Sequence, residues 1–324
     1  MKLKNNYNMF SEIKDYGAVF ETLVTKTANY LIQNNIKAQI LGISGGIDST
    51  VCAAICHEVS KRTNIPLIGR SLPTSFNKKD EISSADLVGN AFCDDYKEVP
   101  ISKLCWTFSE VLIGYEKTAQ TNLANGNIQA RLRMIYLYNL ASLYKGIVID
   151  TDNLTENNLG YFTIHGDVGD FNPIGGLWKT EIFELAKWLL SSYSFQLPHN
   201  MYEATSEQLE KSGKIFQQGR AIKESLKLKP TAGLGITNND LEEIGAESYE
   251  QVDYILQEIL AWKWLSKQRG DIFGPTWTMR DAFLEEQQML DIPIKIIIAV
   301  ADRHFKSEFK RNKLPIKINR EEII

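Results

Sequence analysis

Apolar residues recur along the first half of the chain in two patterns that alternate with each other. Short apolar runs of strand length lie at residues 40–43, 65–71, 96–101 and 146–150. Between them, apolar positions repeat about every 3.6 residues, which is the period of a helix. We expect such helices up to residue 35 and at residues 49–61, 83–92, 103–120 and 126–144. Strands that alternate with helices predict a doubly wound parallel α/β sheet with helices on both faces.

The second half of the chain carries fewer strand patterns. Helices are expected at residues 180–190 and 240–256, whereas residues 192–229 have no apolar strand run and are rich in Ser, Gln, Lys and Gly. Residues 294–300 are rich in β-branched side chains, which on pattern alone favours a strand. We expect one domain over residues 1–324, with a lid or insertion at about 192–229 and a helical C-terminal part at about 240–324.

A glycine-rich loop separates the first expected strand from the helix that follows it. Its sequence is SGGIDS, from Ser44 to Ser49. Adjacent glycines allow a ligand to approach the backbone, and the first turn of a helix offers unpaired N–H groups with partial positive charge. The loop lacks the Lys of a Walker loop and the spacing of GxGxxG. An oligophosphate suits this loop, although a simple tight turn is the alternative.

Charged residues near this loop are candidates for the chemistry. A carboxylate beside phosphates is repulsive unless a divalent cation lies between them, so Asp48 is interpreted as a Mg²⁺ ligand. Glu156, in a segment rich in Asp, Asn and Thr after the fourth strand, could face the same metal. Lys179 could neutralise phosphate charge, and Arg131 near a helix start is a plausible anion contact. The alternative for each is an ordinary surface or helix-terminal charge.

Composition narrows the class of protein. A formal net charge of −4 over 324 residues argues against a general nucleic-acid or membrane-surface binder. Neither a signal peptide nor an apolar run of the ~20 residues that a membrane span needs is present, so we expect a cytoplasmic protein. The four cysteines form no CxxC pair, and buried thiols are favoured over a zinc site at Cys52, Cys56 and His57.

The loop SGGIDST resembles that of the ATP pyrophosphatases, and further blocks resemble the NAD synthetases. These blocks are GNIQARLRM, the TDN segment with its downstream GYFT and HGD, KPTAGL and FKRNKLP. The resemblance implies a homodimeric α/β fold with a helix over residues 294–300. It also implies an enzyme that uses ATP and Mg²⁺ to adenylate the nicotinate carboxylate of deamido-NAD, after which ammonia displaces AMP.

The resemblance carries site roles to individual residues. It implies catalytic roles for Asp48, Glu156 and Lys179, with Asp48 and Glu156 as the magnesium ligands. The implied ATP contacts are Gly42, Ile43, Ser44, Gly45, Gly46, Ile47, Asp48, Ser49, Thr151, Lys179 and Thr231. The implied deamido-NAD contacts are Arg131, Asp170, Phe309 and Lys310.

The sequence departs from the family pattern mainly on the side of the acid substrate. A family Lys is Ile164 here, a family His is Phe309, a family Lys is Gln129, and a family Gly is Asp150. A lost charge-assisted hydrogen bond costs roughly 1.5–3 kcal/mol. Some relatives prefer nicotinate mononucleotide, so this smaller acid is the alternative substrate.

Three classes of function remain open at this stage. An amide ligase that uses free ammonia is favoured, because no glutamine-hydrolysing domain precedes residue 38 and none of the cysteines has the context of such a nucleophile. A tRNA-modifying ATP pyrophosphatase is expected to carry a basic surface. A non-catalytic nucleotide-binding protein of the same fold would not need Glu156 and Lys179.

Overall fold

The computed structural model describes residues 12–112, 119–195, 205–230, 240–273, 276–287, 291–311 and 316–317. In this part of the chain the strands form one parallel sheet in the order β3-β2-β1-β4-β5-β6. The strands are β1 (Gln39–Gly42), β2 (Leu67–Ser71), β3 (Asp95–Glu98), β4 (Ile147–Ile149), β5 (Phe171–Asn172) and β6 (Ile316–Lys317). At its centre, Leu41 of β1 lies between Gly69 of β2 and Ile149 of β4.

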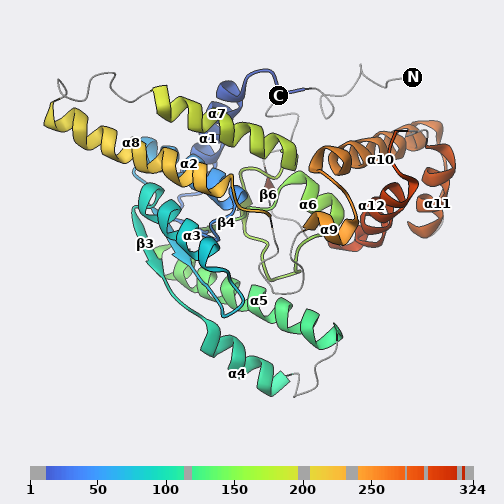
Figure 1. Ribbon diagram of the computed structural model, residues 1–324, viewed down its shortest axis with the longest axis horizontal. Helices are drawn as coiled ribbons and strands as arrows, with labels where there is room; N and C mark the ends of the chain where they lie inside the picture. Colours follow the sequence, from blue (N-terminus) through green and yellow to red (C-terminus); the bar gives the residue numbers. More distant parts are fainter. Residues whose placement is uncertain are drawn as a thin grey trace.

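Helices cover both faces of this sheet, as expected (Figure 1). One face packs on α1 (Tyr16–Gln33), α2 (Ile47–Thr63), α3 (Lys79–Phe92), α7 (Lys179–Phe195) and α8 (Ser206–Ser225). The other face packs on α4 (Ser102–Leu112) and α5 (Ala119–Tyr144). Neighbouring strand residues point to opposite faces, so Ile40 and Leu41 are both fully buried but on opposite faces of the sheet. We call the apolar packing around the sheet the main core.

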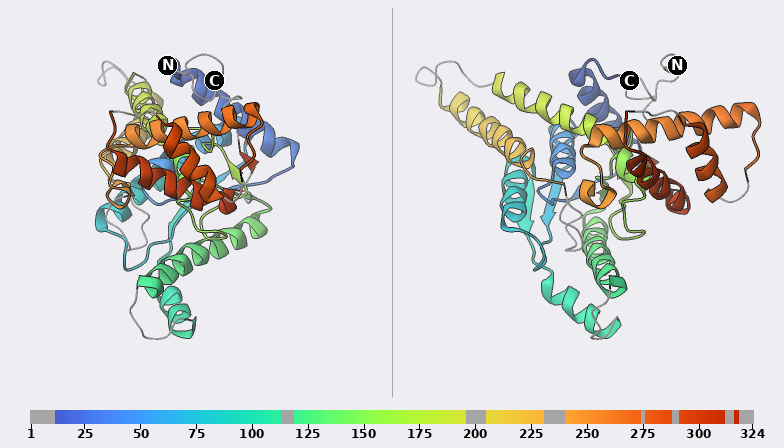
Figure 2. Two further views of the ribbon diagram at one scale, coloured as in Figure 1. Left: turned by 90° about the vertical axis from the view of Figure 1, so that its right-hand side faces the viewer. Right: turned by 45° about the vertical axis from the view of Figure 1, so that its right-hand side comes forward.

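A second, all-helical core lies beside the sheet. It contains α6 (Leu154–Leu159), α9 (Asp240–Ile244), α10 (Tyr249–Arg269), α11 (Thr276–Glu286) and α12 (Ile294–Lys306), and the short α13 (Glu308–Arg311) follows. We call α9 to α13 the C-terminal helical unit. Figures 1 and 2 show this unit on one side of the molecule and α4 with α5 projecting below the sheet.

The four expected strands and the main helices are present, which confirms the doubly wound α/β class. Residues 294–300 are helical in α12, where Ile296, Ile297 and Val300 pack into the second core. The helix expected at 240–256 is interrupted between α9 and α10, where Gly245 has a φ of 75° that favours glycine. The short strands β5 and β6 were not predicted.

The segment expected to form a lid or insertion contains α8. This helix packs against α3 and α7, and its residues Ala221 and Ile222 are fully buried in the main core. Leu228, Lys229 and Pro230, just after α8, reach the cavity described below. The division into a lid and a C-terminal part stays a prediction. Within the described residues, every helix is too short or too polar to span a membrane.

Candidate nucleotide-binding site

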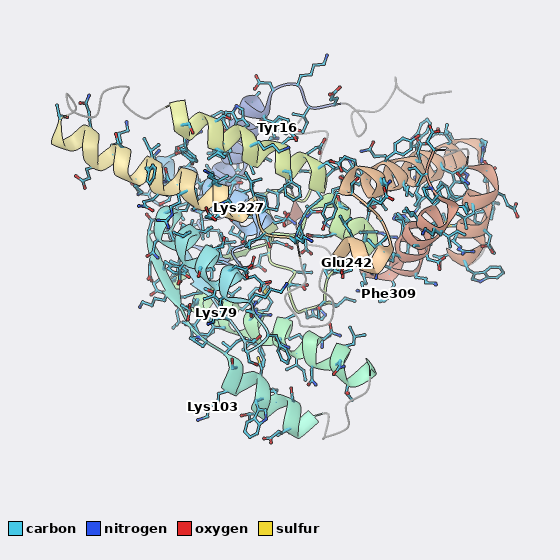
Figure 3. The ribbon with its side chains drawn as sticks, viewed as in Figure 1. Tyr16, Lys79, Lys103, Lys227, Glu242 and Phe309 are labelled. Atoms are coloured by element: carbon cyan, nitrogen blue, oxygen red, sulfur yellow. The ribbon has the colours of Figure 1, made fainter. Side chains whose placement is uncertain are left out.

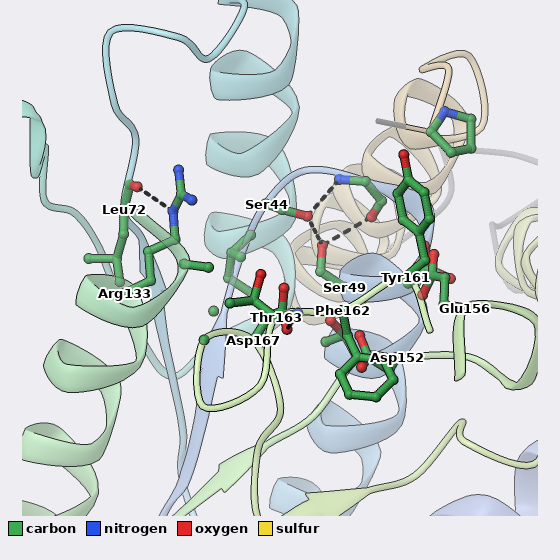
Figure 4. A pocket seen from close by; sticks show the side chains of 18 of the residues that line it. Ser44, Ser49, Leu72, Arg133, Asp152, Glu156, Tyr161, Phe162, Thr163 and Asp167 are labelled. Carbon is green, nitrogen blue, oxygen red and sulfur yellow. Dashed lines mark hydrogen bonds between the residues drawn. The ribbon is translucent and has the colours of Figure 1, made fainter. Parts of the chain in front are cut away.

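A cavity of about 670 Å³ opens at the carboxyl edge of the parallel sheet. Its wall includes the ends of three strands, at Gly42, Ser71 and Ile149. Ligands of doubly wound proteins collect at this edge, because loops from neighbouring strands diverge there. Figure 4 shows the cavity with the loop after β1 above it, and with Arg133 and Glu156 at opposite sides.

The loop between β1 and α2 is shaped by its contacts with α3. Gly45 has a φ of 85°, and a Cβ on it would lie 2.4 Å from the carbonyl oxygen of Glu81. The Ser84 hydroxyl donates a 2.8 Å hydrogen bond to the Gly45 carbonyl. Gly45 therefore serves the packing of α3 on the loop, while Ser44 and Gly46 to Ser49 line the cavity.

The N-terminus of α2 faces the cavity without a side-chain cap. Gly46 holds the N-cap position and has no side chain that could accept from the first amides of the helix. The hydroxyls of Ser44 and Ser49 lie 3.0 Å apart, and Ser49 donates to the Gly46 carbonyl at 3.0 Å. Uncapped amides, the helix dipole and two hydroxyls together form an anion-binding cradle.

Lys179 joins two carboxylates at this cradle. Its Nζ donates to Asp48 Oδ2 at 2.5 Å and to Glu156 Oε1 at 2.9 Å. The Lys179 side chain is 1% exposed, and the two carboxylates are 17% and 19% exposed. Burial alone would lower the pKa of Lys179, but Asp48 and Glu156 raise it well above its usual value. The lysine is therefore a cation, and both carboxylates lie within reach of one positive charge.

Asn153 organises the same carboxylates from the start of α6. Its Oδ1 accepts from the Glu156 amide at 3.0 Å, and its own amide donates to Glu156 Oε2 at 3.2 Å, which is a capping box. Its Nδ2 donates to Asp48 Oδ1 at 2.9 Å. This fully buried side chain therefore connects the helix that carries Glu156 to the loop that carries Asp48.

Two further carboxyl groups lie below the cradle. Asp150 accepts from the amides of Asp152 and Gly169 at 2.8 and 3.1 Å. Burial raises the pKa of Asp150 to about 7, although these amides oppose the shift. Asp152 lines the cavity, and its Oδ2 has no hydrogen-bond partner within the described residues. Burial and the charge of Asp150 raise the pKa of Asp152 well above its usual value.

The opposite wall is built from α5 and the loop after β2. Arg133 lines the cavity and donates from Nε to the Leu72 carbonyl at 3.1 Å and from Nη2 to Asn77 Oδ1 at 3.2 Å. Gln129, one helical turn earlier, accepts a 2.9 Å hydrogen bond from the Thr74 hydroxyl and is buried. These contacts fix the loop after β2 against α5.

The structure brings most of the expected ATP-side residues together. Gly42, Ile43, Ser44, Gly46, Ile47, Asp48, Ser49, Thr151, Glu156 and Lys179 line the cavity. Thr231 lies outside the described residues. Arg70, at the end of β2, also lines the cavity, where it is buried and paired with Asp95 at 2.8 Å.

The residues expected on the acid-substrate side are more dispersed. Lys310 lines the cavity, but its Nζ donates to the carbonyls of Gly160 and Phe162, both at 2.8 Å. Arg131 and Phe309 are exposed and lie outside the cavity wall, and Figure 3 labels Phe309 beside the C-terminal helices. Asp170 also lies outside the wall and accepts from the Tyr138 hydroxyl at 2.8 Å.

Arg133 and Asn153 were not singled out from the sequence. Arg133 lies two positions after Arg131, which is about 200° around a helix, so the two arginines point to opposite faces. Leu137 and Leu140 are buried on the same face of α5 as Arg133, four and seven positions later. This helical spacing is visible in the sequence and could have identified Arg133 as the inward-facing arginine. Asn153 could have been found from its N-cap position three residues before Glu156.

A parallel sheet with an anion cradle at its carboxyl edge, flanked by a carboxylate pair and a buried lysine, defines a nucleotide-binding α/β protein. The family model described as NAD synthase matches residues 19–314. The chain therefore belongs to the NAD synthase family.

Individual relatives agree with this family. The chain is 35% identical to the NH(3)-dependent NAD(+) synthetase of Thermoplasma volcanium over 222 residues, which is 68% of this chain and 76% of the relative. It is 32% identical to that of Methanococcoides burtonii over 227 residues, covering 70% and 73% of the two chains. The solved structure of NMN synthetase from Francisella tularensis matches with a TM-score of 0.64 and 25% identity, over 95% of this chain and all of that one.

Proposed function

We propose that this protein is an ammonia-dependent NAD synthetase, a carbon–nitrogen ligase. In this reaction the nicotinate carboxylate of deamido-NAD attacks the α-phosphate of ATP and releases pyrophosphate, and ammonia then displaces AMP to give NAD. One observation carries the proposal: the anion cradle of the loop after β1 and the Asp48–Lys179–Glu156 cluster meet in one cavity. A merely nucleotide-binding protein does not need a buried lysine shared by two carboxylates.

Mg²⁺ fits the residues that are present. Asp48 and Glu156 both bind the same Lys179 Nζ, so their oxygens lie close enough to share one cation, and carboxylate oxygens are ligands that Mg²⁺ prefers. Within the described residues no group of three or more metal-ligating side chains converges, so phosphate oxygens and water would complete the shell. When bound, Mg²⁺ would neutralise charge on the transferred phosphate oxygens.

The protein's own groups would position the reacting atoms. The amides at the start of α2 and the hydroxyls of Ser44 and Ser49 would hold the pyrophosphate part of ATP. The ammonium of Lys179 would stabilise negative charge that develops at the phosphates, and its burial makes this stabilisation stronger than in water. Fixing the two substrates in one cavity supplies much of the remaining rate enhancement.

Free ammonia is the proposed nitrogen donor. The relatives from Thermoplasma volcanium and Methanococcoides burtonii, whose names specify NH(3) dependence, align over 76% and 73% of their own lengths. Glutamine is then not expected to replace ammonia.

A homodimer is proposed because the acid-substrate residues lie on an open surface. Arg131 shares one face of α5 with Ile135 and Tyr138, which are exposed, and Tyr138 holds Asp170. Trp106 and Val111 of α4 are 64% and 78% exposed, an unusual degree for large apolar side chains. A second copy packed on α4 and α5 would cover this surface and close the site around the distal part of deamido-NAD.

Nicotinate mononucleotide remains the second candidate substrate. It is favoured by one observation, the match to an NMN synthetase structure over 95% of this chain. The replacement of a family Lys by Ile164 points in the same direction, because deamido-NAD carries an additional nucleotide that needs contacts.

The test is an assay of AMP formation with purified protein, ATP, Mg²⁺ and ammonium, with deamido-NAD or nicotinate mononucleotide as the acid. We expect AMP and the corresponding amide in equal amounts, with deamido-NAD as the better substrate. Glutamine in place of ammonium should give no amide. Absence of AMP with both acids would reject the proposal. Amide formation from glutamine in a buffer from which free ammonia has been removed would reject ammonia as the nitrogen donor.

A further inference from the structure

Asp253 is a buried carboxylate of α10 that contacts the two helices bearing Glu156 and Lys179. It is 2% exposed. Its Oδ1 accepts from the Thr155 hydroxyl at 2.5 Å. Its Oδ2 accepts from the Thr180 hydroxyl at 2.8 Å and from the Thr180 amide at 3.1 Å. Thr155 precedes Glu156, and Thr180 follows Lys179.

Thr155 and Asp253 together replace the missing N-cap of α7. The residue before this helix is Trp178, whose side chain has no oxygen to accept from the first amides. The Lys179 amide instead donates to the Thr155 hydroxyl at 2.8 Å, and the Thr180 amide donates to Asp253. A carboxylate at a helix N-terminus also interacts favourably with the helix dipole.

These contacts fix the backbone from which Lys179 extends toward Asp48 and Glu156. Thr155 Oγ1 is shared, because it donates to Asp253 and accepts from the Lys179 amide. Loss of the Asp253 carboxylate would leave the partly buried Thr180 amide without this acceptor and would free the Thr155 hydroxyl to rotate. A displacement of about 1 Å at a positioning group can cost about a hundredfold in rate.

We propose that Asp253 is a positioning residue for the ligase reaction, through which the C-terminal helical unit holds Lys179 and Glu156 in their working geometry. The inference rests on the proposed function, because it assigns those two residues to the reacting phosphates. Apolar contacts already join α10 to α6 and to the residue before α7, since Val252 and Leu256 pack with Leu159 and Trp178 in the second core. Attachment of α10 to these two helices therefore does not require a buried acid at position 253.

The experiment compares Asp253→Ala and Asp253→Asn with wild type in the full-length protein. The matched control is Asp302→Asn, which removes a charge from the same unit. Among the described residues Asp302 pairs with Arg280 and Lys306, at 2.7 and 2.9 Å, and with neither of the helices that carry Glu156 and Lys179. Each variant is measured for kcat and KM of AMP formation and for melting temperature. The affinity for Mn²⁺ in the presence of ATP, followed by electron paramagnetic resonance, adds a readout that needs no turnover.

For Asp253→Ala we expect a fall in kcat of about tenfold or more, equivalent to about 1.4 kcal/mol or more. The KM for the acid substrate should stay within about twofold, and Mn²⁺ affinity with ATP should weaken by about tenfold. Asp253→Asn should lose less, because its oxygen can still accept from the Thr180 amide. Asp302→Asn should keep wild-type kcat and Mn²⁺ affinity.

A folded Asp253→Ala with wild-type kcat and Mn²⁺ affinity would overturn the inference. A fall in kcat that is fully explained by a smaller fraction of folded protein would overturn it as well. If Asp253→Ala does not fold, Thr155→Val is the deciding variant, because it removes the shared hydroxyl without burying a new polar group. A wild-type kcat of Thr155→Val would overturn the inference. If the wild type forms no AMP, the proposed function fails separately. The Mn²⁺ affinities then still test the positioning role.

Discussion

The side-chain amide of Asn153 donates a 2.9 Å hydrogen bond to the carboxylate of Asp48, across 105 positions of sequence. The same side chain caps the helix that carries Glu156. Asn153 thereby orients both proposed metal ligands, and it does so from the buried end of the cluster. A hydrogen bond to a charged group contributes about 1.5–3 kcal/mol. We therefore expect Asn153 to contribute to stability through Oδ1, which caps the helix, and to activity through Nδ2, which binds Asp48.

Substitution of Asn153 can separate these two contributions. Asn153→Ala removes the cap and should lower the free energy of unfolding by about 1–2 kcal/mol. Asn153→Ser keeps a capping oxygen but has no amide for Asp48, so it should recover most of that stability. Both variants should lower kcat/KM of AMP formation by about tenfold or more, because Asp48 loses its donor in each. Urea denaturation and steady-state kinetics check the two effects.

The outcome for Asn153→Ser decides this interpretation. If it has wild-type kcat/KM, the Asn153–Asp48 bond has no role in activity. If it is as unstable as Asn153→Ala, the capping role assigned to Asn153 is wrong.

Removal of either proposed metal ligand should abolish AMP formation without unfolding the protein. Asp48→Asn and Glu156→Gln keep the shape of each side chain while removing the charge that would bind Mg²⁺. Both carboxylates lie at the cavity wall rather than in a core. Circular dichroism should resemble wild type, and the melting temperature should fall only modestly, because Lys179 keeps the other carboxylate as a partner. Full Mg²⁺-dependent AMP formation by either variant would contradict the metal assignment.

The lysine between these ligands gives a second test of the metal site. Lys179→Met leaves Asp48 and Glu156 without their shared cation, and loss of one partner from a buried ion pair costs about 3–5 kcal/mol. Because both carboxylates retain some contact with solvent, the lower end of that range is expected. Added Mg²⁺ should raise the melting temperature of Lys179→Met more than that of wild type, since a divalent cation can take up the released charge. Equal Mg²⁺ responses in the two proteins would argue against a metal between these carboxylates.

The buried Asp253 predicts a specific dependence of stability on pH. Burial raises its pKa to about 6, against hydrogen bonds from Thr155 and Thr180 that lower it, whereas an unfolded Asp has a pKa of about 3.9. An acid with the higher pKa in the folded state takes up a proton on folding between these values. Its contribution to stability is therefore greatest below about pH 4 and falls as the pH rises to about 6.

Asp253→Asn removes this titration. The free energy of unfolding of the variant, relative to wild type, should increase by about 2 kcal/mol between pH 4 and pH 7. Urea midpoints of both proteins at matched pH values measure the difference, and other carboxyl groups cancel in it. A constant difference across this range would show that Asp253 does not titrate there.

The central strands and the loop after β1 could be predicted because their signals are local. A run of apolar residues followed by SGGIDS specifies a buried strand, a turn and a helix start within a dozen residues. The short strands β5 and β6 could not be predicted in this way, because two residues each show no period. In the backbone register of the sheet, Phe171 pairs with Ile316, which is far away in the chain.

The choice between neighbouring residues on α5 needed the tertiary structure. Arg131 and Arg133 are equally basic, and only the position of the helix on the sheet directs Arg133 into the cavity and leaves Arg131 exposed. Gln129 was interpreted as a lost charge on the acid-substrate side, but its amide is buried against Thr74. Asp253 lies 98 positions from Thr155, so no local pattern connects it to the site.

The last prediction concerns the acid substrate, where Ile164 and Gln129 both replace a family Lys. Ile164 is partly exposed, so a lysine there can reach solvent or a bound ligand. Gln129 is 3% exposed and accepts from Thr74, so a lysine there would lose this bond and bury an unpaired charge. The two positions therefore form a matched pair for testing which departure carries specificity.

Wild type should prefer deamido-NAD over nicotinate mononucleotide by less than about a hundredfold in kcat/KM, because one charge-assisted contact is missing. Ile164→Lys should raise that preference by about tenfold, since a restored contact of about 1.4 kcal/mol acts only on the larger substrate. Gln129→Lys should lower the melting temperature and leave the ratio of kcat/KM values unchanged. A wild-type preference above a thousandfold that Ile164→Lys does not alter would mean that position 164 carries no substrate specificity, and that contacts from a second subunit bind the distal part of deamido-NAD instead.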